Sequence, residues 1–499
     1  MKRFAAVLAI ICVLGVTTTA GAIDFKIRGQ MWIAIGGGEL DLINKTRQGN
    51  NGKTSVATGD KFRAIQRTRL WLDAVASESL SGHVWFQMGG QNWGRAAQGA
   101  ALGADGVVVK LRTAYIDWTP PDVDLKVRMG LQQVRMPHKA GGPGVLDTRG
   151  AGITASWAAT ENLGFTGFWI RPNNDNYEGD EGRQVGYLDN FDLFGLTVPI
   201  KYEGVELTPW AMMGMMGRNT FRSGSNWTDG APLFTLRPYF GTPNNEHPIN
   251  RTTKTYGSTV WAGLPLQLTL WDPWNIEFDF NYGYVAPLGR YDTFKGRDRE
   301  HVRGSVERQG WLAKALVEYK MDWGVPGVFG WYASGDDGNI KNGSERMPSL
   351  VPYVNFTSFF ADGNLGWAWQ DFTDSYSGTW GVGAQVRDIS FVEKLTHTVR
   401  AAWWGGTNST SMVKYMDAAY SWNYGASHFD GPYMTTRDGM LEFNLVNVYK
   451  MYENFNINFE AGYVANFMDN DVWKKAGARD TSFEKRDIWK VQCSFLYAF

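Results

Sequence analysis

The feature that most constrains this chain is a recurring alternation of apolar and polar residues. The segment IDFKIRGQMWIAI, at residues 23–35, puts Ile23, Phe25 and Ile27 on one face and Lys26 and Arg28 on the other. Seventeen similar segments follow, at residues 62–76, 82–91, 107–118, 125–132, 151–158, 163–171, 194–202, 205–216, 256–271, 275–286, 309–320, 325–334, 376–388, 395–405, 438–450, 455–466 and 487–499. Each is about as long as a tilted strand needs to cross a bilayer, so an all-β chain is expected.

The connectors between these segments alternate in length. Short links such as SESLSG, TPPDVD and EG alternate with long polar stretches at 36–60, 172–193, 217–254, 335–375 and 406–437. This asymmetry is typical of outer-membrane barrels, whose sheets must close because lipid offers no hydrogen-bond partners. We therefore expect a transmembrane antiparallel β-barrel of about 18 strands, with short periplasmic turns and long external loops. The aromatic-rich stretch 335–375 leaves 16 or 20 strands open.

The N-terminus is typical of a secretory signal peptide over residues 1–22. Lys2 and Arg3 precede an apolar run from Phe4 to Val16, and small residues lead to a cleavage site after Ala22. The run of about 13 apolar residues is short for a membrane-spanning helix of roughly 20, and no longer run follows. We expect residues 23–499 to form one barrel domain in the bacterial outer membrane, in contact with its lipid and lipopolysaccharide.

The chain ends on a strand whose apolar face is aromatic. Phe495, Tyr497 and Phe499 occupy alternate positions in DIWKVQCSFLYAF, with polar residues among those between. In a closed barrel the last strand must pair with the first, so this segment is expected to close the sheet with its aromatic face towards lipid. A terminal Phe preceded by alternating aromatics also resembles the assembly signal of outer-membrane barrels, which implies the barrel-assembly machinery as a partner.

The polar faces of the first five segments are strongly basic. If the apolar face meets lipid, nine basic side chains point inward, against only Asp24 and Asp73 on the same faces. The nine are Lys26, Arg28, Arg63, Arg67, Arg69, Lys110, Arg112, Lys126 and Arg128. Neighbouring strands bring such side chains within reach of one another, so we expect a basic, water-filled lumen.

Counter-charges are expected from two later regions. The long loop between the fifth and sixth segments, QVRMPHKAGGPGVLDTRGAG, carries Arg135, Asp147 and Arg149, and its glycines and prolines suit a loop folded into the lumen. The far wall is expected to be more acidic, with carboxylates on the polar faces at Glu277, Asp279, Glu318, Glu442 and Glu460. Basic and acidic groups that face each other across a constriction would sort solutes by charge.

Together, the signal, the amphipathic strands, the third long loop and the terminal Phe resemble a general-diffusion, homotrimeric bacterial outer-membrane porin. The segment IQRTRLWLDAVASESLSGHVWFQMGG is similar to the second and third strands of that family, with an Arg-x-Arg pair before a short turn. The resemblance implies that Arg63, Arg67 and Arg69 line the constriction and that Asp147 is the carboxylate of the third loop.

The expected function is passive diffusion of small hydrophilic solutes and ions, with a preference for anions. The third loop carries more basic than acidic residues, whereas the loop of the family is typically acidic. A solute-specific channel for oxyanions or oligosaccharides on the same barrel is the alternative. The resemblance also implies a homotrimer, and the outward residues Ala64, Gln66 and Thr68 would suit a subunit interface.

No residue pattern indicates an enzyme, a cofactor or a metal. The six histidines are far apart, and no Ser/His/acid spacing, Cys-x-x-Cys pair or phosphate loop occurs. The stretch GDDGNIKNG at 335–343 resembles a calcium loop without the closing Glu, so we interpret it as a solvated turn, with a calcium-stabilised loop as the alternative. Basic and acidic residues nearly balance, at 49 and 50, so no nucleic-acid partner is expected.

Overall fold

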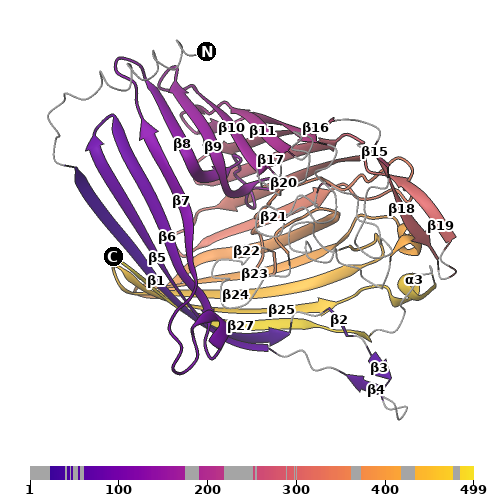
Figure 1. Cartoon of the computed structure of the whole chain (residues 1–499). Coiled ribbons are helices and arrows are strands. Elements are labelled where there is room, and N and C mark those ends of the chain that lie inside the picture. Colours follow the sequence, from indigo (N-terminus) through magenta and orange to yellow (C-terminus); the bar gives the residue numbers. More distant parts are fainter. Residues whose placement is uncertain are drawn as a thin grey trace.

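The main sheet of the chain closes into an antiparallel barrel (Figure 1). A computed structural model describes residues 23–39, 42–44, 46–48, 54–56, 61–174, 190–217, 236, 251–252, 256–287, 289–296, 298, 300–360, 373–416, 433–475 and 484–499. The signal peptide expected at residues 1–22 lies outside this range.

Twenty strand segments make up eighteen spanning strands, because β11 with β12, and β13 with β14, are each one interrupted strand. Pro199 and Pro209 lie at the two interruptions, where they lack the N–H that a strand ladder needs. The segments are β1 (Asp24–Glu39), β5 (Lys61–Ser77), β6 (Leu80–Asn92), β7 (Val109–Trp118), β8 (Leu125–Arg135), β9 (Asp147–Ala158), β10 (Gly164–Asn174), β11 (Asn190–Thr197), β12 (Ile200–Tyr202), β13 (Val205–Leu207), β14 (Trp210–Gly217), β16 (Tyr256–Leu268), β17 (Trp274–Val285), β20 (Arg308–Tyr319), β21 (Val325–Ala333), β22 (Thr379–Val392), β23 (Leu395–Gly406), β24 (Gly439–Tyr452), β25 (Phe455–Asn466) and β27 (Ile488–Ala498). Each predicted segment coincides with one spanning strand, and the described parts of 335–375 add none.

The first and last strands pair and close the sheet, as predicted. β1 is hydrogen-bonded to both β5 and β27, with Ile33 opposite Phe495. Phe499 exchanges backbone hydrogen bonds of 2.7 and 2.9 Å with Gly29, and its ring occupies the space that a side chain at position 29 would need. The seam therefore runs to the last residue of the chain.

The outward face of the strands is apolar. Phe25, Ile27, Val328 and Val382 stand outward, with between 54% and 69% of their surface exposed. Apolar side chains on the outer face are what a barrel presents to the hydrocarbon core of a bilayer. The predicted transmembrane barrel fold is confirmed.

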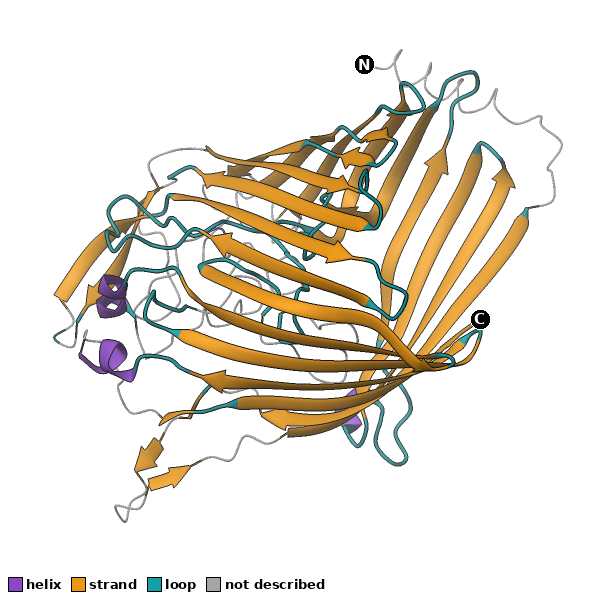
Figure 2. Cartoon of the chain, turned by 180° about the vertical axis from the view of Figure 1, so that it is seen from behind, coloured by secondary structure: helices purple, strands orange, loops and turns teal. Residues whose placement is uncertain are grey.

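Short turns gather at one end of the barrel and long connections at the other. The short turns include residues 78–79, 203–204 and 453–454. The long connections carry the small elements β2 (Ile43–Asn44), β3 (Thr46–Gln48), β4 (Thr54–Val56), η1 (Ala96–Gln98), β15 (Arg251–Thr252), β18 (Gly289–Lys295), β19 (Glu300–Ser305), η6 (Thr410–Tyr415), α3 (Asn470–Lys475) and β26 (Glu484–Lys485). Figures 1 and 2 show several of them, including β3, β4, β18 and β19, at the end of the barrel away from the C-terminus.

Two long connections fold into the barrel and lie against each other. We call residues 136–146 inner loop A and residues 344–360 inner loop B. The N–H groups of Leu350 and Tyr353 in loop B each donate at 2.9 Å to loop A, to the carbonyls of Val145 and Pro143. Gly142 has a φ of 82°, and a Cβ there would lie 2.3 Å from the Tyr353 carbonyl oxygen, so this close approach requires glycine. The predicted inward fold of loop A is confirmed, and loop B adds a second inward segment.

Candidate functional site

Three arginines from three strands surround one tryptophan on the inner face of the barrel. The guanidinium carbons of Arg69 (β5), Arg112 (β7) and Arg149 (β9) lie 5.2, 5.6 and 4.5 Å from the ring centre of Trp85 on β6. Trp71 stacks on Trp85, with 5.4 Å between the ring centres. Cations are attracted to the negative face of an indole ring. We call Arg69, Arg112, Arg149 and Trp85 the arginine cage.

The pairing register of β5, β6 and β7 brings most of this group together. Trp85 lies opposite Trp71 on one side and opposite Thr113 on the other. The register then shifts, so that Phe86 lies opposite Leu111 and Arg112 is an extra residue in β7. A bulge of this kind reverses the inward and outward parity of the strand. Arg112 still faces the lumen as predicted, because its guanidinium lies over Trp85.

The bulge corrects the predicted balance of inward charges. Because the parity of β7 reverses at Arg112, Asp117 faces the lumen and accepts two hydrogen bonds from Arg128, at 2.7 and 2.9 Å. Strict alternation would place Asp117 outward. The expectation that only Asp24 and Asp73 oppose the basic residues is therefore wrong.

Strands β8 and β9 bend away from the wall into the lumen, and this bend carries Arg149 to Trp85. Arg149 lies opposite Gln133, and Asp147 lies opposite Arg135, across the two bent strands. The sequence places Arg149 in a loop, whereas it belongs to the paired part of β9. A bend in the strands, which periodicity does not indicate, completes the cage.

The cage contains hydrogen-bond donors that are not used. The buried Nε atoms of Arg112 and Arg149 and the indole Nε1 of Trp85 have no hydrogen-bond partner. Arg69 donates to Gln87 Oε1 at 3.4 Å. Among the described residues, no carboxylate is ion-paired with Arg69, Arg112 or Arg149. The three arginines as a whole are half-buried, so their outer amino groups remain open to an anion that enters from the lumen.

Most of the other predicted basic residues are paired with carboxylates. These pairs are Lys26–Asp24, Arg28–Asp73, Lys126–Asp117, Arg128–Asp117 and Arg135–Asp147, with distances of 2.7 to 3.8 Å. Arg67 is buried beside Trp32, 4.5 Å from its ring centre. Arg63 and Lys110 occupy inner-face positions of β5 and β7. Asp147, predicted as the loop carboxylate of the constriction, neutralises Arg135.

A hydrogen-bonded chain of Asp73, His83 and Ser81 lies on the inner face towards the short-turn end. His83 Nδ1 lies 2.7 Å from Asp73 Oδ1, and His83 Nε2 lies 2.9 Å from Ser81 Oγ. Asp117 Oδ2 is 3.6 Å from the same Nε2, and the imidazole stacks on Tyr115. Local sequence does not indicate this group, because Asp73 and His83 meet only through the register of β5 and β6.

The five predicted carboxylates of the far wall do not form an open acidic surface. Three of them are in ion pairs, Asp279–Lys314, Glu318–Arg387 and Glu460–Lys490, at 3.0, 2.7 and 3.6 Å. Glu277 accepts a hydrogen bond of 3.1 Å from the side-chain amide of Asn275. The prediction of an open acidic far wall opposite the basic strands is therefore wrong.

Several far-wall side chains hold the inner loops in place. Lys314 is fully buried and donates to the carbonyl oxygens of Ala140, at 2.7 Å, and of Gly142. Glu442, the fifth predicted carboxylate, accepts from Thr357 Oγ1 at 3.0 Å and from the N–H of Phe359 at 3.3 Å. Loops fixed to the far wall occupy that part of the lumen, so a passage would run beside the basic strands.

Inner loop B contributes to the other side of the cage. Tyr353 lies close enough to Arg69 to interact with it electrostatically. The backbone at Tyr353 is in turn fixed to inner loop A through Pro143. The cage therefore has the wall strands and the β8–β9 pair around it, with inner loop B near Arg69.

No protein-family model matches this sequence, and no curated protein matches it. Similar solved structures include Acinetobacter baumannii OccAB3, at 10% identity and a TM-score of 0.49, over 95% of this chain and 99% of that chain. A BenF-like porin from Pseudomonas fluorescens Pf-5 is similar at 12% identity and 0.49, over 95% and 98%. Pseudomonas aeruginosa OccK2 (OpdF) in complex with glucuronate is similar at 11% identity and 0.48, over 95% and 98%. These identities are too low to carry a function over to this chain.

The described residues also bear on the candidate calcium loop. Asp337 in this loop accepts hydrogen bonds from the N–H of Asn339, at 2.7 Å, and from Nδ2 of Asn342, at 3.1 Å. Within the part of the chain that the structure describes, no three His, Cys, Asp or Glu side chains gather as metal ligands. Asp337 is thus bonded within its own turn, and the turn is also bonded to neighbouring segments, for example by Asp336 to Asn408 and Tyr433. Of the helices that are described, none is long and apolar enough to cross a membrane.

Proposed function

We propose that this chain forms a water-filled pore in the bacterial outer membrane, through which small hydrophilic anions pass. The barrel is closed and apolar outside, as a bilayer requires, and its early strands are polar and basic inside. The inner loops occupy the far side of the lumen, so solutes would pass the arginine cage. Export by a signal peptide at 1–22, followed by assembly of residues 23–499, belongs to the same proposal.

The observation that carries this proposal is the unpaired positive charge of the cage. Arg69, Arg112 and Arg149 converge on Trp85 without an ion-paired carboxylate among the described residues. Two unit charges about 4 Å apart interact by about 4 kcal/mol at an effective dielectric constant of about 20. An anion in the cage would be attracted by three charges, and a cation would be repelled by them. The constriction is therefore expected to select anions.

A solute-specific channel is the second candidate, and the convergence of three guanidinium groups favours it. Arg69, Arg112 and Arg149 are half-buried, so their outer amino groups can donate hydrogen bonds to one small carboxylate or oxyanion. A channel with such a binding site would carry a current that saturates as the anion concentration rises, whereas passive diffusion would remain proportional to concentration. Single-channel currents over a range of anion concentrations distinguish the two.

Planar-bilayer recording of the refolded protein tests the anion preference. In a salt gradient, the reversal potential of the wild type should show anion selectivity, and the combined Arg69→Gln, Arg112→Gln and Arg149→Gln variant should lose most of it. Arg437→Gln is the matched control, because this exposed arginine pairs with Asp469 outside the cage. Cation selectivity of the wild type, or an unchanged potential in the triple variant, would refute the proposal.

One observation favours a hydrolase. Asp73, His83 and Ser81 are hydrogen-bonded in the order of a catalytic triad. A triad also needs donors where negative charge develops, whereas Asp117 places a second carboxylate 3.6 Å from His83. We therefore propose no enzymatic role. The purified protein should hydrolyse p-nitrophenyl acetate no faster than its Ser81→Ala variant, and a rate that depends on Ser81 would overturn this part of the proposal.

We also propose that the barrel assembles as a homotrimer. Ala64, Gln66 and Thr68 lie on the outward face of β5, and Gln66 accepts a hydrogen bond of 3.0 Å from Trp93 Nε1, so this face carries a polar patch. A polar patch suits a subunit interface better than lipid. If the protein migrates as a trimer on unboiled gels and as a monomer after heating, this would support the homotrimer. A monomer in mild detergent would contradict it. The C-terminal strand is the proposed contact with the barrel-assembly machinery.

A further inference from the structure

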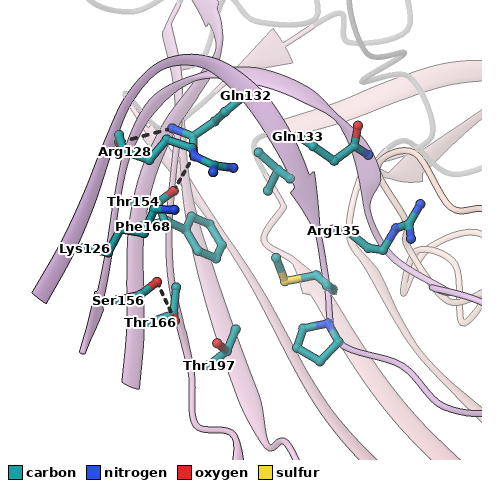
Figure 3. A pocket seen from close by; sticks show the side chains of 13 residues that line it. Lys126, Arg128, Gln132, Gln133, Arg135, Thr154, Ser156, Thr166, Phe168 and Thr197 are labelled. Atoms are coloured by element: carbon teal, nitrogen blue, oxygen red, sulfur yellow. Dashed lines mark hydrogen bonds between the residues drawn. The ribbon is translucent and has the colours of Figure 1, made fainter. Parts of the chain in front are cut away.

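A second cavity, of about 290 Å³, lies under the bend of β8 and β9, against strands β10 and β11 (Figure 3). This volume corresponds to about ten water molecules at about 30 Å³ each, and it is close to the lower limit for small-molecule pockets. It lies on the inner face of the barrel but outside the arginine cage. The cavity therefore has room for a small solute.

The strand register arranges the wall of this cavity in two rows of neighbouring side chains. The first row is Lys126, Ser156, Thr166 and Thr197, and the second is Arg128, Thr154 and Phe168. Figure 3 shows these side chains together on one side of the cavity, with Gln133 and Arg135 on the other. Successive strands thus present a hydroxyl group at the same level, which forms a continuous polar track.

The hydroxyl groups of the track can both donate and accept hydrogen bonds. Thr154 Oγ1 donates to Gln132 Oε1 at 2.9 Å, which leaves its lone pairs as acceptors. Thr166 Oγ1 donates to Ser156 Oγ at 2.9 Å, which leaves the Ser156 hydroxyl proton as a donor. The hydroxyl groups of a solute have the same double character, so the track matches a ligand with adjacent hydroxyl groups.

The charged groups of the cavity are ion-paired, but one positive charge is left over. Lys126 and Arg128 share one carboxylate, Asp117, at 2.8 and 2.7 Å, and Arg135 is bound to Asp147. The Phe168 ring adds an apolar surface beside the hydroxyl track. This combination suits a hydroxylated solute with one negative charge, whereas the arginine cage offers guanidinium groups without a hydroxyl track.

The cavity lies on the short-turn side of the cage. By the strand register, Arg128 and Thr154 are level with Asp117, four residues along β7 from Thr113, the partner of Trp85. Four residues of an antiparallel strand span about 14 Å, which is longer than a four-carbon chain. A small anion would therefore occupy the cage and the cavity in turn.

We propose that this cavity is a second solute subsite, which binds a small hydroxylated organic anion on the short-turn side of the cage. The proposal rests on the proposed anion channel and names the solute class: a hydroxylated carboxylate, such as an aldonic acid of about four carbons. The subsite would retain such an anion longer than an anion of equal charge and chain length without hydroxyl groups.

Two four-carbon monoanions test this subsite, threonate with three hydroxyl groups and butyrate with none. Block of the single-channel chloride current, titrated with each anion, gives two half-saturation concentrations, and the wild type should bind threonate several-fold more tightly. In the Ser156→Ala/Thr166→Val variant, the ratio of the two concentrations should fall by at least about 3- to 10-fold, since the loss of one hydrogen bond to the solute weakens binding by about that factor. The two mutated hydroxyls bond to each other, so the double change leaves neither without its partner.

Thr398→Val is the matched control, because Thr398 is an inner-face hydroxyl of β23 on the far wall. Equal binding of the two anions by the wild type, or an unchanged ratio in the Ser156→Ala/Thr166→Val variant, would overturn the subsite. Arg149→Gln separates this failure from that of the channel proposal, because it should weaken both anions together. If Arg149→Gln changes the binding of neither anion, the cage assignment fails. If Arg149→Gln weakens both anions but the threonate-to-butyrate ratio is unchanged in the Ser156→Ala/Thr166→Val variant, only the subsite fails.

Discussion

At the scale of single residues, the charge of the constriction depends on which basic side chains have partners. Asp117 is ion-paired with both Lys126 and Arg128, whereas Arg112 and Arg149 have no ion-paired carboxylate among the described residues and keep unbonded Nε atoms beside Trp85. A buried donor without an acceptor is unfavourable by about 1–3 kcal/mol, and more if it is charged. The guanidinium groups themselves are half-buried, so their outer amino groups can meet water or a solute. Anion preference should therefore come from the cage more than from the whole basic face.

Glu345, outside the spanning strands, links stability to pH. Burial, together with the charges of the nearby Asp336 and Asp337, raises the pKa of Glu345 from its ordinary 4.5 to about 7. Because the folded value exceeds the unfolded one, this group contributes stability below about pH 4.5 that is lost as the pH rises through 7. Glu345→Gln should therefore leave the thermal midpoint in micelles nearly unchanged at pH 5 and raise it at pH 8.

The control for this pH effect is Glu393→Gln, at an exposed carboxylate in a short turn. That change should move the midpoint equally little at both pH values. Gln keeps an oxygen for the N–H of Asp337, which Glu345 now binds at 3.0 Å, so the loop should retain its turn. A wild-type midpoint as high at pH 8 as that of Glu345→Gln would show that the carboxyl is not destabilising when charged.

At the scale of elements, inner loop B is held by a few polar contacts to the wall. Glu442 accepts from Thr357, from the N–H of Phe359 and from Trp404 Nε1. Glu442→Ala would leave these donors without an acceptor, each unfavourable by about 1–3 kcal/mol. We expect the loop to detach intermittently, so that single-channel recordings show additional levels of higher conductance and a noisier open state.

Glu393→Ala serves as the control for the loop anchor, because it removes a carboxylate that the inner loops do not contact in the described structure. Its current should match that of the wild type. A steady current of wild-type amplitude in Glu442→Ala would show that loop A and the remaining anchors suffice. Asn444, which accepts from the N–H of Ser358 at 3.1 Å, would then be the next anchor to remove.

Local periodicity predicted the eighteen strands, because each spanning strand must be apolar on the lipid side along its whole length. It could not predict the bulge at Arg112, which reverses the parity of β7 and turns Asp117 inward. It also could not predict the bend that brings Arg149 to Trp85, since that contact depends on packing between distant strands. The strands were therefore predictable, whereas the charge pairing inside them required the register.

At the scale of the whole molecule, the lumen is asymmetric. The far wall and the two inner loops form a connected, buried cluster that includes Trp261, Phe359 and Tyr376. The strands β1 and β5–β8 face this cluster with basic and aromatic side chains. The filled side fixes the position of the loops, and the basic side is left to meet solutes, so selectivity depends on the barrel keeping its shape around both sides.

The seam between β1 and β27 should therefore limit the stability of the whole barrel. Gly38 lies opposite Lys490 across this seam, and a Cβ at Gly38 would lie 2.2 Å from the carbonyl oxygen of Trp489. Because that atom belongs to the backbone, Gly38→Ala must push the two strands apart, at a cost of about 1–3 kcal/mol. Gly82→Ala in β6 is the matched control, since a Cβ there meets nothing within 4 Å. Urea unfolding of the barrel in micelles should show a lower midpoint with an unchanged slope for Gly38→Ala. Equal midpoints for the two alanine variants would mean that the two seam strands accommodate the added methyl group without loss of stability. The closing strand would then not control the stability of the barrel.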